Sequence, residues 1–133
     1  MSDLDRATQL EFIMDHYQNP RNRGEMADAD VHVEGGHPGC SDLITMYLKF
    51  DGDRVSNVSY IGEGCTISQA SVSALTEQLK GMTIQELEGL DHEFISDLIG
   101  EEIVQTRPRC ATLGLDVLHA SIKAYRKKQI LGG

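Results

Sequence analysis

Apolar residues near the start of the chain recur at the spacing of an α-helix. In the segment LDRATQLEFIMDHY, residues 4–17, the positions Leu10, Ile13, Met14 and Tyr17 follow the i, i+3, i+4, i+7 pattern of one helix face. The segment NPRNRG comes next, and its proline disfavours helical geometry at the residue before it. The pattern therefore predicts a helix that ends before this proline.

The next apolar segments have the composition of strands. VHVE at 31–34 is a short candidate strand, and LITMYLKF at 43–50 mixes β-branched and aromatic residues in partial alternation. DGDR at 51–54 contains the Asp-Gly pair that is typical of a hairpin turn, and VSNVSYIG at 55–62 supplies the return strand. These segments predict a small antiparallel sheet of three strands.

The second half of the chain has the pattern of helices. Residues 67–80, ISQASVSALTEQLK, are rich in small residues and end at Gly81. TIQELEGL opens with Thr83 and Glu86 in the spacing of a capping box, the reciprocal hydrogen-bond pattern of a helix start. HEFISDLI predicts a further short helix.

One long helix is predicted for PRCATLGLDVLHASIKAYRKK, residues 108–128. Its proline lies where a first helical residue tolerates the missing N–H group. The side chains expected on its inward face are Leu113, Val117, Leu118, Ile122 and Tyr125. Because strands come first and helices later, the sequence indicates an α+β fold with the helices packed on one face of the sheet.

The end of this last segment concentrates positive charge. KAYRKK holds Lys123, Arg126, Lys127 and Lys128. Cations suit the last turn of a helix, where the helix dipole is negative, and we favour that interpretation. The alternative, a docking patch for an acidic partner, stays open.

Length and composition fit one domain, residues 1–133, of an ordinary globular protein. The formal net charge of −9 argues against nucleic-acid binding, which requires a basic surface. No apolar run approaches the length that crosses a membrane, and MSDLDRATQL lacks the layout of a signal peptide. We therefore expect a cytoplasmic protein with no membrane or nucleic-acid partner.

The three cysteines all fall at the ends of predicted elements. Cys40 lies on the turn GGHPGCSD, Cys65 follows GEG directly before a helix, and Cys110 lies in the first turn of the last helix. A helix N-terminus lowers the pKa of a thiol, and Arg109 is expected to stabilise the Cys110 thiolate in the same way. Three inert core cysteines remain the alternative.

Three thiolates and one oxygen or nitrogen ligand would make a tetrahedral, zinc-like site. Asp42, two residues after Cys40, is the obvious fourth ligand, and His37 is the competitor. The spacing is not that of a zinc finger, because no two cysteines form a C-x-x-C pair. A metal site is one of the possibilities that spacing alone leaves open.

Other catalytic chemistry has little support. The sequence contains no glycine-rich phosphate loop and no H-E-x-x-H motif. A cysteine–histidine nucleophile pair could be drawn with any of four histidines, and nothing in the sequence favours one of them: His16, His32, His92 and His119.

Three segments resemble the U-type iron–sulfur cluster assembly proteins, namely the NifU N-terminal domain, IscU and SufU. GGHPGCSD is similar to the first-cysteine loop of that family, GEGCTISQASVSALTEQLKG to its second-cysteine segment, and RPRCATLGLDVLHASI to its third. With IMDHYQNPRNRG near the start, the resemblance extends over nearly the whole chain.

The resemblance implies an α+β fold with the ligands gathered at one exposed end. Carried over residue by residue, it makes Cys40, Asp42, Cys65 and Cys110 the ligands of a metal or of a transient 2Fe–2S cluster. It also implies a pyridoxal-phosphate cysteine desulfurase as partner, with Cys110 as a candidate persulfide acceptor, and apoproteins that receive the cluster. Zinc is expected in the resting form.

Departures from the family pattern indicate which branch of the family, IscU or SufU, the chain resembles more. The run VQTRPRC lacks the chaperone-recognition motif of IscU, so no Hsp70-type chaperone is expected, and Arg109 replaces the histidine of IscU and cannot be a ligand. Arginine here and CATL after it are similar to SufU. SufU proteins, however, usually carry a helical insertion between the second and third cysteines, and only 44 residues separate Cys65 from Cys110.

The first loop is expected to present Cys40 and Asp42 outward, so that a thiolate and a more exchangeable carboxylate share one metal. A ligand that exchanges suits a site that releases its cargo. The sequence favours a scaffold for cluster assembly over a zinc-dependent sulfurtransferase of the SufU type. A zinc-stabilised binding module without transfer chemistry is the third hypothesis.

Overall fold

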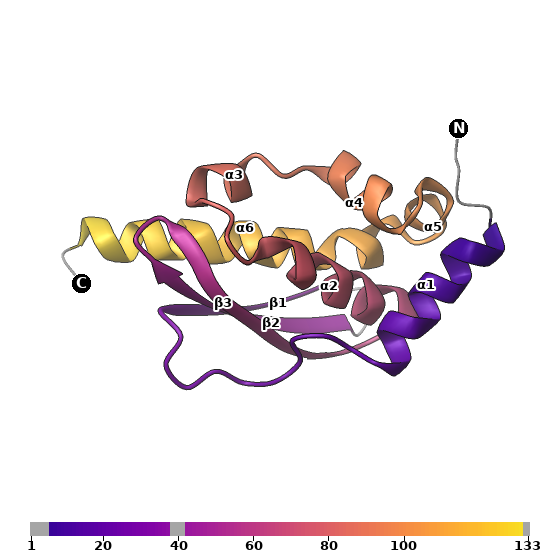
Figure 1. Ribbon diagram of the computed structural model, residues 1–133, viewed down its shortest axis with the longest axis horizontal. Helices are drawn as coiled ribbons and strands as arrows, with labels where there is room; N and C mark the ends of the chain where they lie inside the picture. Colours follow the sequence, from indigo (N-terminus) through magenta and orange to yellow (C-terminus); the bar gives the residue numbers. More distant parts are fainter. Residues whose placement is uncertain (1–5, 38–41, 132–133) are drawn as a thin grey trace.

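The computed structural model describes residues 6–37 and 42–131 (Figure 1). In chain order the elements are α1 (Arg6–Gln18), β1 (Val31–His37), β2 (Asp42–Asp51), β3 (Arg54–Glu63), α2 (Thr66–Leu79), α3 (Ile84–Glu88), α4 (His92–Ile99), α5 (Glu101–Thr106) and α6 (Pro108–Ile130). None of the helices within these ranges is long and apolar enough to span a membrane.

The three strands form one antiparallel sheet in the order β1-β2-β3, which confirms the predicted sheet. Asp51 pairs with Arg54 across the tight β2–β3 turn, where Gly52 adopts a φ of +65° that glycine tolerates best. At the other end of the sheet His37 pairs with Asp42, and Leu43 pairs with Glu63. Asp42, at the start of the central strand, therefore lies at the same end of the sheet as the last residues of β3.

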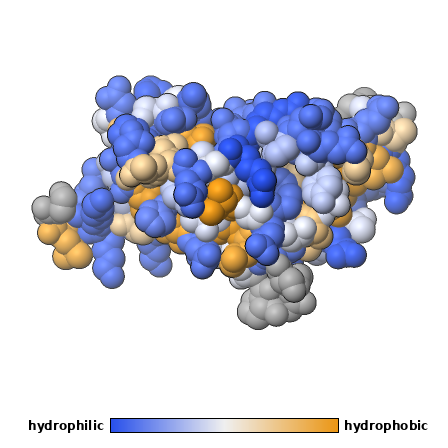
Figure 2. All heavy atoms as spheres, turned by 90° about the horizontal axis from the view of Figure 1, so that it is seen from below, coloured by the Kyte–Doolittle hydropathy of each residue, from blue (hydrophilic) through white to orange (hydrophobic). Residues whose placement is uncertain are grey.

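Helices α2 and α6 cover one face of the sheet and enclose the core with it (Figure 1). The two helices approach closely where Gly114 of α6 meets Val72 of α2, because a Cβ atom on Gly114 would lie 3.1 Å from the valine side chain. The inward face predicted for the last helix is confirmed, with Leu113, Val117, Leu118 and Ile122 buried and Tyr125 stacked on Phe50. Viewed from below, the molecule has a mostly hydrophilic surface with separate hydrophobic patches (Figure 2).

The first helix is present, but most of its apolar pattern faces solvent. Ile13 is buried, whereas Leu10, Met14 and Tyr17 are 45%, 41% and 44% exposed. Helix α1 packs on α2 rather than on the sheet, so only a narrow strip of it meets a neighbour. That strip includes the histidine His16, which is buried.

Helix α5 was not predicted from the sequence. Its six residues, EEIVQT, follow Gly100, which has a φ of +105° and ends α4. Only Ile103 of this helix is buried. A short segment with one buried residue carries too little periodicity to be recognised as a helix.

A buried polar cluster fastens α1 to α2. His16 is 2% exposed, its Nδ1 lies 2.8 Å from Ser73 Oγ, and its Nε2 lies 3.4 Å from Glu77 Oε1. The backbone N–H of Arg21 also donates to Ser73 Oγ, at 2.9 Å. Burial, followed by the positive charge of Arg21, lowers the pKa of His16 below its usual value of 6.5, against the opposing effect of Glu77 and Asp15.

We predict that acid weakens the fold through His16. The pKa of His16 is lower in the folded chain than in the unfolded chain. Its contribution to the free energy of unfolding is therefore complete above pH 6.5 and decreases as the pH falls below that value. Urea midpoints at about pH 7.5 and about pH 5.5 measure the loss. In His16→Gln the urea midpoint should fall less between the two pH values. An equal fall in both proteins would contradict the role of His16.

Candidate metal centre

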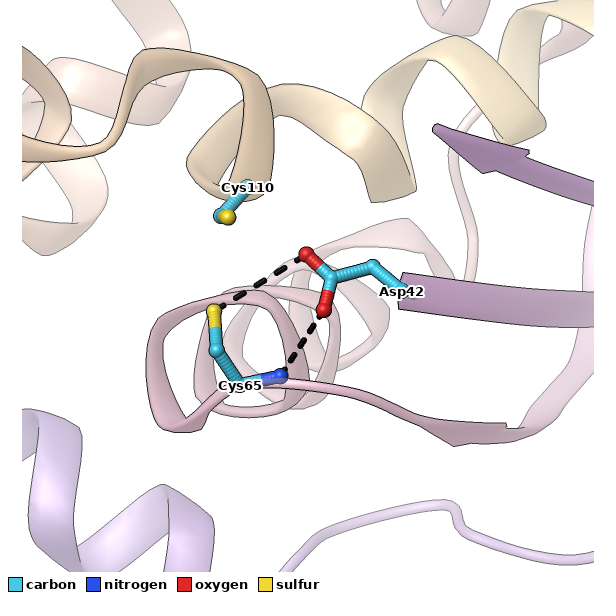
Figure 3. Close-up of side chains that lie close together, drawn as sticks. All are labelled: Asp42, Cys65 and Cys110. Atoms are coloured by element: carbon cyan, nitrogen blue, oxygen red, sulfur yellow. Dashed lines mark hydrogen bonds between the residues drawn. The ribbon is translucent and has the colours of Figure 1, made fainter. Parts of the chain in front are cut away.

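Three potential ligand side chains meet at one end of the molecule (Figure 3). Asp42 is the first residue of β2, Cys65 directly precedes α2, and Cys110 is the third residue of α6. One ligand atom from each lies within 4.8 Å of the other two. Residues far apart in sequence are thus brought together because β2, α2 and α6 all begin at this end.

Asp42 is held by the start of α2. The backbone N–H of Cys65 donates to Asp42 Oδ1 at 2.8 Å, and Cys65 Sγ lies 3.9 Å from Asp42 Oδ2. The Cys65 sulfur also caps α2, since it accepts a hydrogen bond from the backbone N–H of Ser68 at 3.4 Å. The carboxylate and the thiol are therefore positioned by two different backbone N–H groups of the same helix start, those of Cys65 and Ser68.

Gly64 makes room for the carboxylate. It has a φ of +147°, and a Cβ atom at this position would overlap Asp42 Oδ1 and lie 3.0 Å from Asp42 Cα. Any other residue would force the aspartate away from Cys65. This role of Gly64 was not predicted from the sequence, although a glycine directly before the second cysteine is a visible signal.

Cys110 is buried, with 4% of its surface exposed. Burial raises the pKa of its thiol well above the usual range, and the neighbouring Asp42 and Cys65 raise it further. The expectation of a lowered thiol pKa at this helix start is therefore wrong for Cys110. The helix dipole favours the thiolate in this first turn, but desolvation together with two acidic neighbours outweighs it.

The stabilisation of a Cys110 thiolate by Arg109 stays a prediction. It is exposed, and it is absent from the groups that shift the pKa of the Cys110 thiol. No hydrogen bond or ion pair joins its side chain to another residue within 6–37 or 42–131. The adjacent side chains leave α6 in different directions, one into the site and one into solvent.

The expectation that the loop presents Asp42 outward is also wrong. Its side chain is buried, at 5% exposure, because it turns back onto Cys65 (Figure 3). Cys65 is half-buried and is the most accessible of the three groups.

Two candidate ligands, Cys40 and the side chain of His37, are not described by the structure. Cys40 falls outside the described residues. For His37 the backbone is described, and it pairs with Asp42 at the end of β1, but its side chain is not among the described atoms. The fourth ligand expected from the sequence therefore stays a prediction, with Cys40 as the candidate and His37 as the competitor.

The described donors suit a tetrahedral metal. With metal–sulfur bonds of about 2.3 Å and metal–oxygen bonds of about 2.0 Å, ligand atoms in a tetrahedron are about 3.5 to 3.8 Å apart. The Cys65–Asp42 separation of 3.9 Å is close to that value, and the 4.8 Å limit for all three requires an adjustment of only about 1 Å. Two sulfur donors and a carboxylate could hold zinc or iron.

The chain is similar to known proteins over most of its length. Its sequence matches the NifU-like N terminal domain family over residues 8–131. It is 34% identical over 116 residues to the iron–sulfur cluster assembly scaffold protein IscU 1 of Archaeoglobus fulgidus, an alignment that covers 87% of this chain and 75% of that protein. It is 36% identical over 129 residues to the zinc-dependent sulfurtransferase SufU of Bacillus subtilis, covering 84% of this chain and 87% of that protein.

Solved structures share the fold. The crystal structure of FiSufU from Fervidobacterium islandicum superposes with a TM-score of 0.72 at 31% identity, covering 84% of this chain and 94% of that chain. A NifU-like N-terminal domain from Brucella abortus gives a TM-score of 0.78 at 20% identity, covering 89% of this chain and 94% of that chain. At 20% identity the second likeness concerns the fold alone.

We predict that Gly64→Ala weakens metal binding while the fold persists. The added methyl group displaces Asp42 from its place beside Cys65, and loss of such positioning typically lowers metal affinity by about 10- to 100-fold. Competition with a chromophoric zinc chelator measures the affinity, and circular dichroism checks the fold.

Gly24→Ala is the matched control for this variant. Gly24 has a similar φ of +150°, but a Cβ atom there has no neighbour within 4 Å. Both substitutions therefore strain the backbone alike, and only one disturbs Asp42. Equal zinc affinities in the two variants would refute the role of Gly64.

Proposed function

This chain belongs to the NifU-like N-terminal domain family, and on that basis we propose that it is a scaffold for iron–sulfur cluster assembly. In this proposal a 2Fe–2S cluster is built on Cys40, Asp42, Cys65 and Cys110 from sulfur supplied by a pyridoxal-phosphate cysteine desulfurase. The cluster then passes to apoproteins, which makes it the cargo of the protein rather than a resident cofactor.

The observation that carries the proposal is the convergence of Asp42, Cys65 and Cys110 at one end of the fold. Thiolates are the usual ligands of iron–sulfur clusters. A carboxylate among them is a harder donor that binds iron less firmly than a fourth thiolate would. A mixed donor set of this kind suits a cluster that has to leave.

The chain's own groups would change their partners when the metal arrives. Asp42 could keep the hydrogen bond from the N–H of Cys65 to Oδ1 while Oδ2, which lies 3.9 Å from Cys65 Sγ, turns toward the metal. Cys65 and Cys110 would lose their thiol protons, because the thiolate is the form that binds a metal. The N–H of Ser68, which points at the Cys65 sulfur, would stay as a donor to the bound thiolate.

Alignment length supports the scaffold over the sulfurtransferase. The alignment with SufU of Bacillus subtilis runs over 129 residues but covers 84% of this chain, about 112 residues, so that relative carries extra residues inside the aligned region. The alignment with IscU 1 of Archaeoglobus fulgidus runs over 116 residues and covers 87% of this chain, which leaves almost no gap. In length the chain is thus IscU-like, as the short interval between Cys65 and Cys110 had indicated.

A sulfurtransferase is the second candidate, favoured by the 36% identity to SufU and by Arg109 with CATL after it. In that case the Cys110 thiolate would attack the outer sulfur of a desulfurase persulfide. A new S–S bond forms on Cys110, the S–S bond on the desulfurase breaks, and the desulfurase cysteine leaves as a thiolate. Zinc held by the same donors would supply a Lewis acid that keeps the thiols deprotonated.

Desulfurase turnover with and without iron distinguishes the two candidates. For a scaffold we expect turnover to rise only when iron is present, together with a visible cluster chromophore that Cys110→Ser abolishes. Thr112→Ser, two residues further along α6, is the control for local disturbance of the helix start. A large rise with zinc alone and no iron, lost in Cys110→Ser, would replace the scaffold by the sulfurtransferase.

Asp42 sets the rate of release in this proposal. We predict that Asp42→Ala and Asp42→Asn both slow cluster transfer to an apo-ferredoxin while the fold is kept. Asparagine can still accept the hydrogen bond from Cys65, so that a slow Asp42→Asn assigns the effect to the carboxylate as ligand. Transfer at the normal rate in Asp42→Asn would exclude this role.

The third hypothesis, a zinc-stabilised binding module, makes a different prediction. Its fold would depend on the metal and would be lost on treatment with a chelator. A chain that keeps its helical circular dichroism after complete metal removal is not such a module. This result is expected, because the core described above encloses more than twenty apolar side chains without the metal ligands.

A further inference from the structure

A groove lies at the end of α6 opposite to the metal centre. It has a volume of about 520 Å³ and runs along α6 beside α3, whose Glu88 forms part of its wall. The two helices lie side by side in Figure 1, where the last turns of α6 project past the sheet. Cys110 and Lys127 are separated by about 25 Å along the same helix, so the groove is distinct from the candidate metal centre.

The floor of the groove is apolar. Ile122 contributes at its inner end and Ile130, which is 82% exposed, at its outer end. From His119 to Ile130 the lining residues of α6 span about 16 Å, the length of roughly three helical turns.

His119 adds an unused hydrogen-bonding group. Its Nε2 atom is shielded from solvent and has no hydrogen-bond partner among the described residues. A shielded polar atom without a partner costs free energy.

The rim of the groove is basic, in contrast to the rest of the chain. Lys123, Arg126 and Lys127 line it, and residues 117–131 contain no carboxylate, although the whole chain carries a net charge of −9. Arg126 is already paired with Glu88, with N–O distances of 2.5 and 2.9 Å. For Lys123 and Lys127 no ion pair exists within the part of the chain that is described.

Helix-end electrostatics account for Lys127 and Lys128 in the last turn of α6, but not for Lys123. Stabilisation by the helix dipole is confined to the last turn, whereas Lys123 lies about two turns before the end of α6 at Ile130. A free cation here beside an apolar groove therefore calls for another explanation.

We propose that this groove docks an acidic, amphipathic helix of a partner protein. Apolar side chains of the partner, spaced at i, i+4 and i+7, would fill the groove between Ile122 and Ile130, as amphipathic helices do in apolar grooves. Carboxylates on the flank of the partner helix would pair with Lys123 and Lys127. The net charge of −9 disfavours an anionic membrane as the occupant, and the groove fits a helix of three turns.

This inference does not rest on the proposed function. A partner docked here would leave the end that carries Asp42, Cys65 and Cys110 uncovered, because the groove is about 25 Å away along α6. The interaction would therefore be compatible with a second protein at the candidate metal centre.

A designed peptide tests the proposal. The probe is a fluorescent helical peptide of about 14 residues, with leucine at i, i+4, i+7 and i+11 and glutamate on both flanks. A second peptide has lysine in place of every glutamate. Fluorescence anisotropy at about 0.15 M salt measures binding to the full chain. We expect micromolar affinity for the acidic peptide only.

Charge reversal identifies the site. Lys123→Glu/Lys127→Glu should lower the affinity for the acidic peptide by at least about tenfold. The same double variant should bind the basic peptide. Lys49→Glu/Lys80→Glu, with the same change of net charge at other surface positions, should leave the acidic peptide's affinity unchanged. Ile130→Ser should weaken it by removing apolar contact.

Three results would overturn the proposal. The first is that the acidic peptide does not bind. The second is that the two double variants lose the same amount of affinity for it. The third is that the chain sediments with vesicles of equal parts phosphatidylcholine and phosphatidylglycerol but does not bind the peptide. The last result would assign the basic end of α6 to a membrane surface instead.

Discussion

The hydrogen bond from the backbone N–H of Cys65 to Asp42 joins the start of β2 to the start of α2. It is possible only because Gly64 has no side chain at the point where the carboxylate approaches. The close packing of Gly114 on Val72 holds α6 against α2, and this places Cys110 beside the same carboxylate. The candidate metal centre is thus a consequence of how three elements begin at one end of the fold, rather than of any local motif.

Without a cation, the surroundings of Cys110 oppose the ionisation of its thiol. Asp42 and Cys65 both raise the pKa of the Cys110 thiol, and burial raises it most. A bound cation would reverse each of these effects, since it stabilises every deprotonated donor around it. Burial therefore makes Cys110 a poor nucleophile until a cation binds.

Local signals in the sequence were sufficient for most of the elements. The Asp51-Gly52 turn and the Thr83–Glu86 capping box involve neighbours in sequence, and both are present in the structure. Three features could not be predicted because they depend on distant residues. The apolar pattern of α1 does not reveal that only a strip of it is covered, GEG does not reveal that Gly64 faces Asp42, and the position of Cys110 in a first helical turn does not reveal its burial. The ligand set itself came from a resemblance, and spacing alone left it open.

X-ray absorption at the zinc edge of the zinc-loaded chain tests the central claim most directly, because it counts the ligands of the bound metal. We expect three sulfur atoms at about 2.3 Å and one oxygen or nitrogen atom at about 2.0 Å. One sulfur should be lost in Cys65→Ser and one in Cys110→Ser. A shell without sulfur, or a sulfur count that neither variant changes, would mean that these side chains do not form the metal centre.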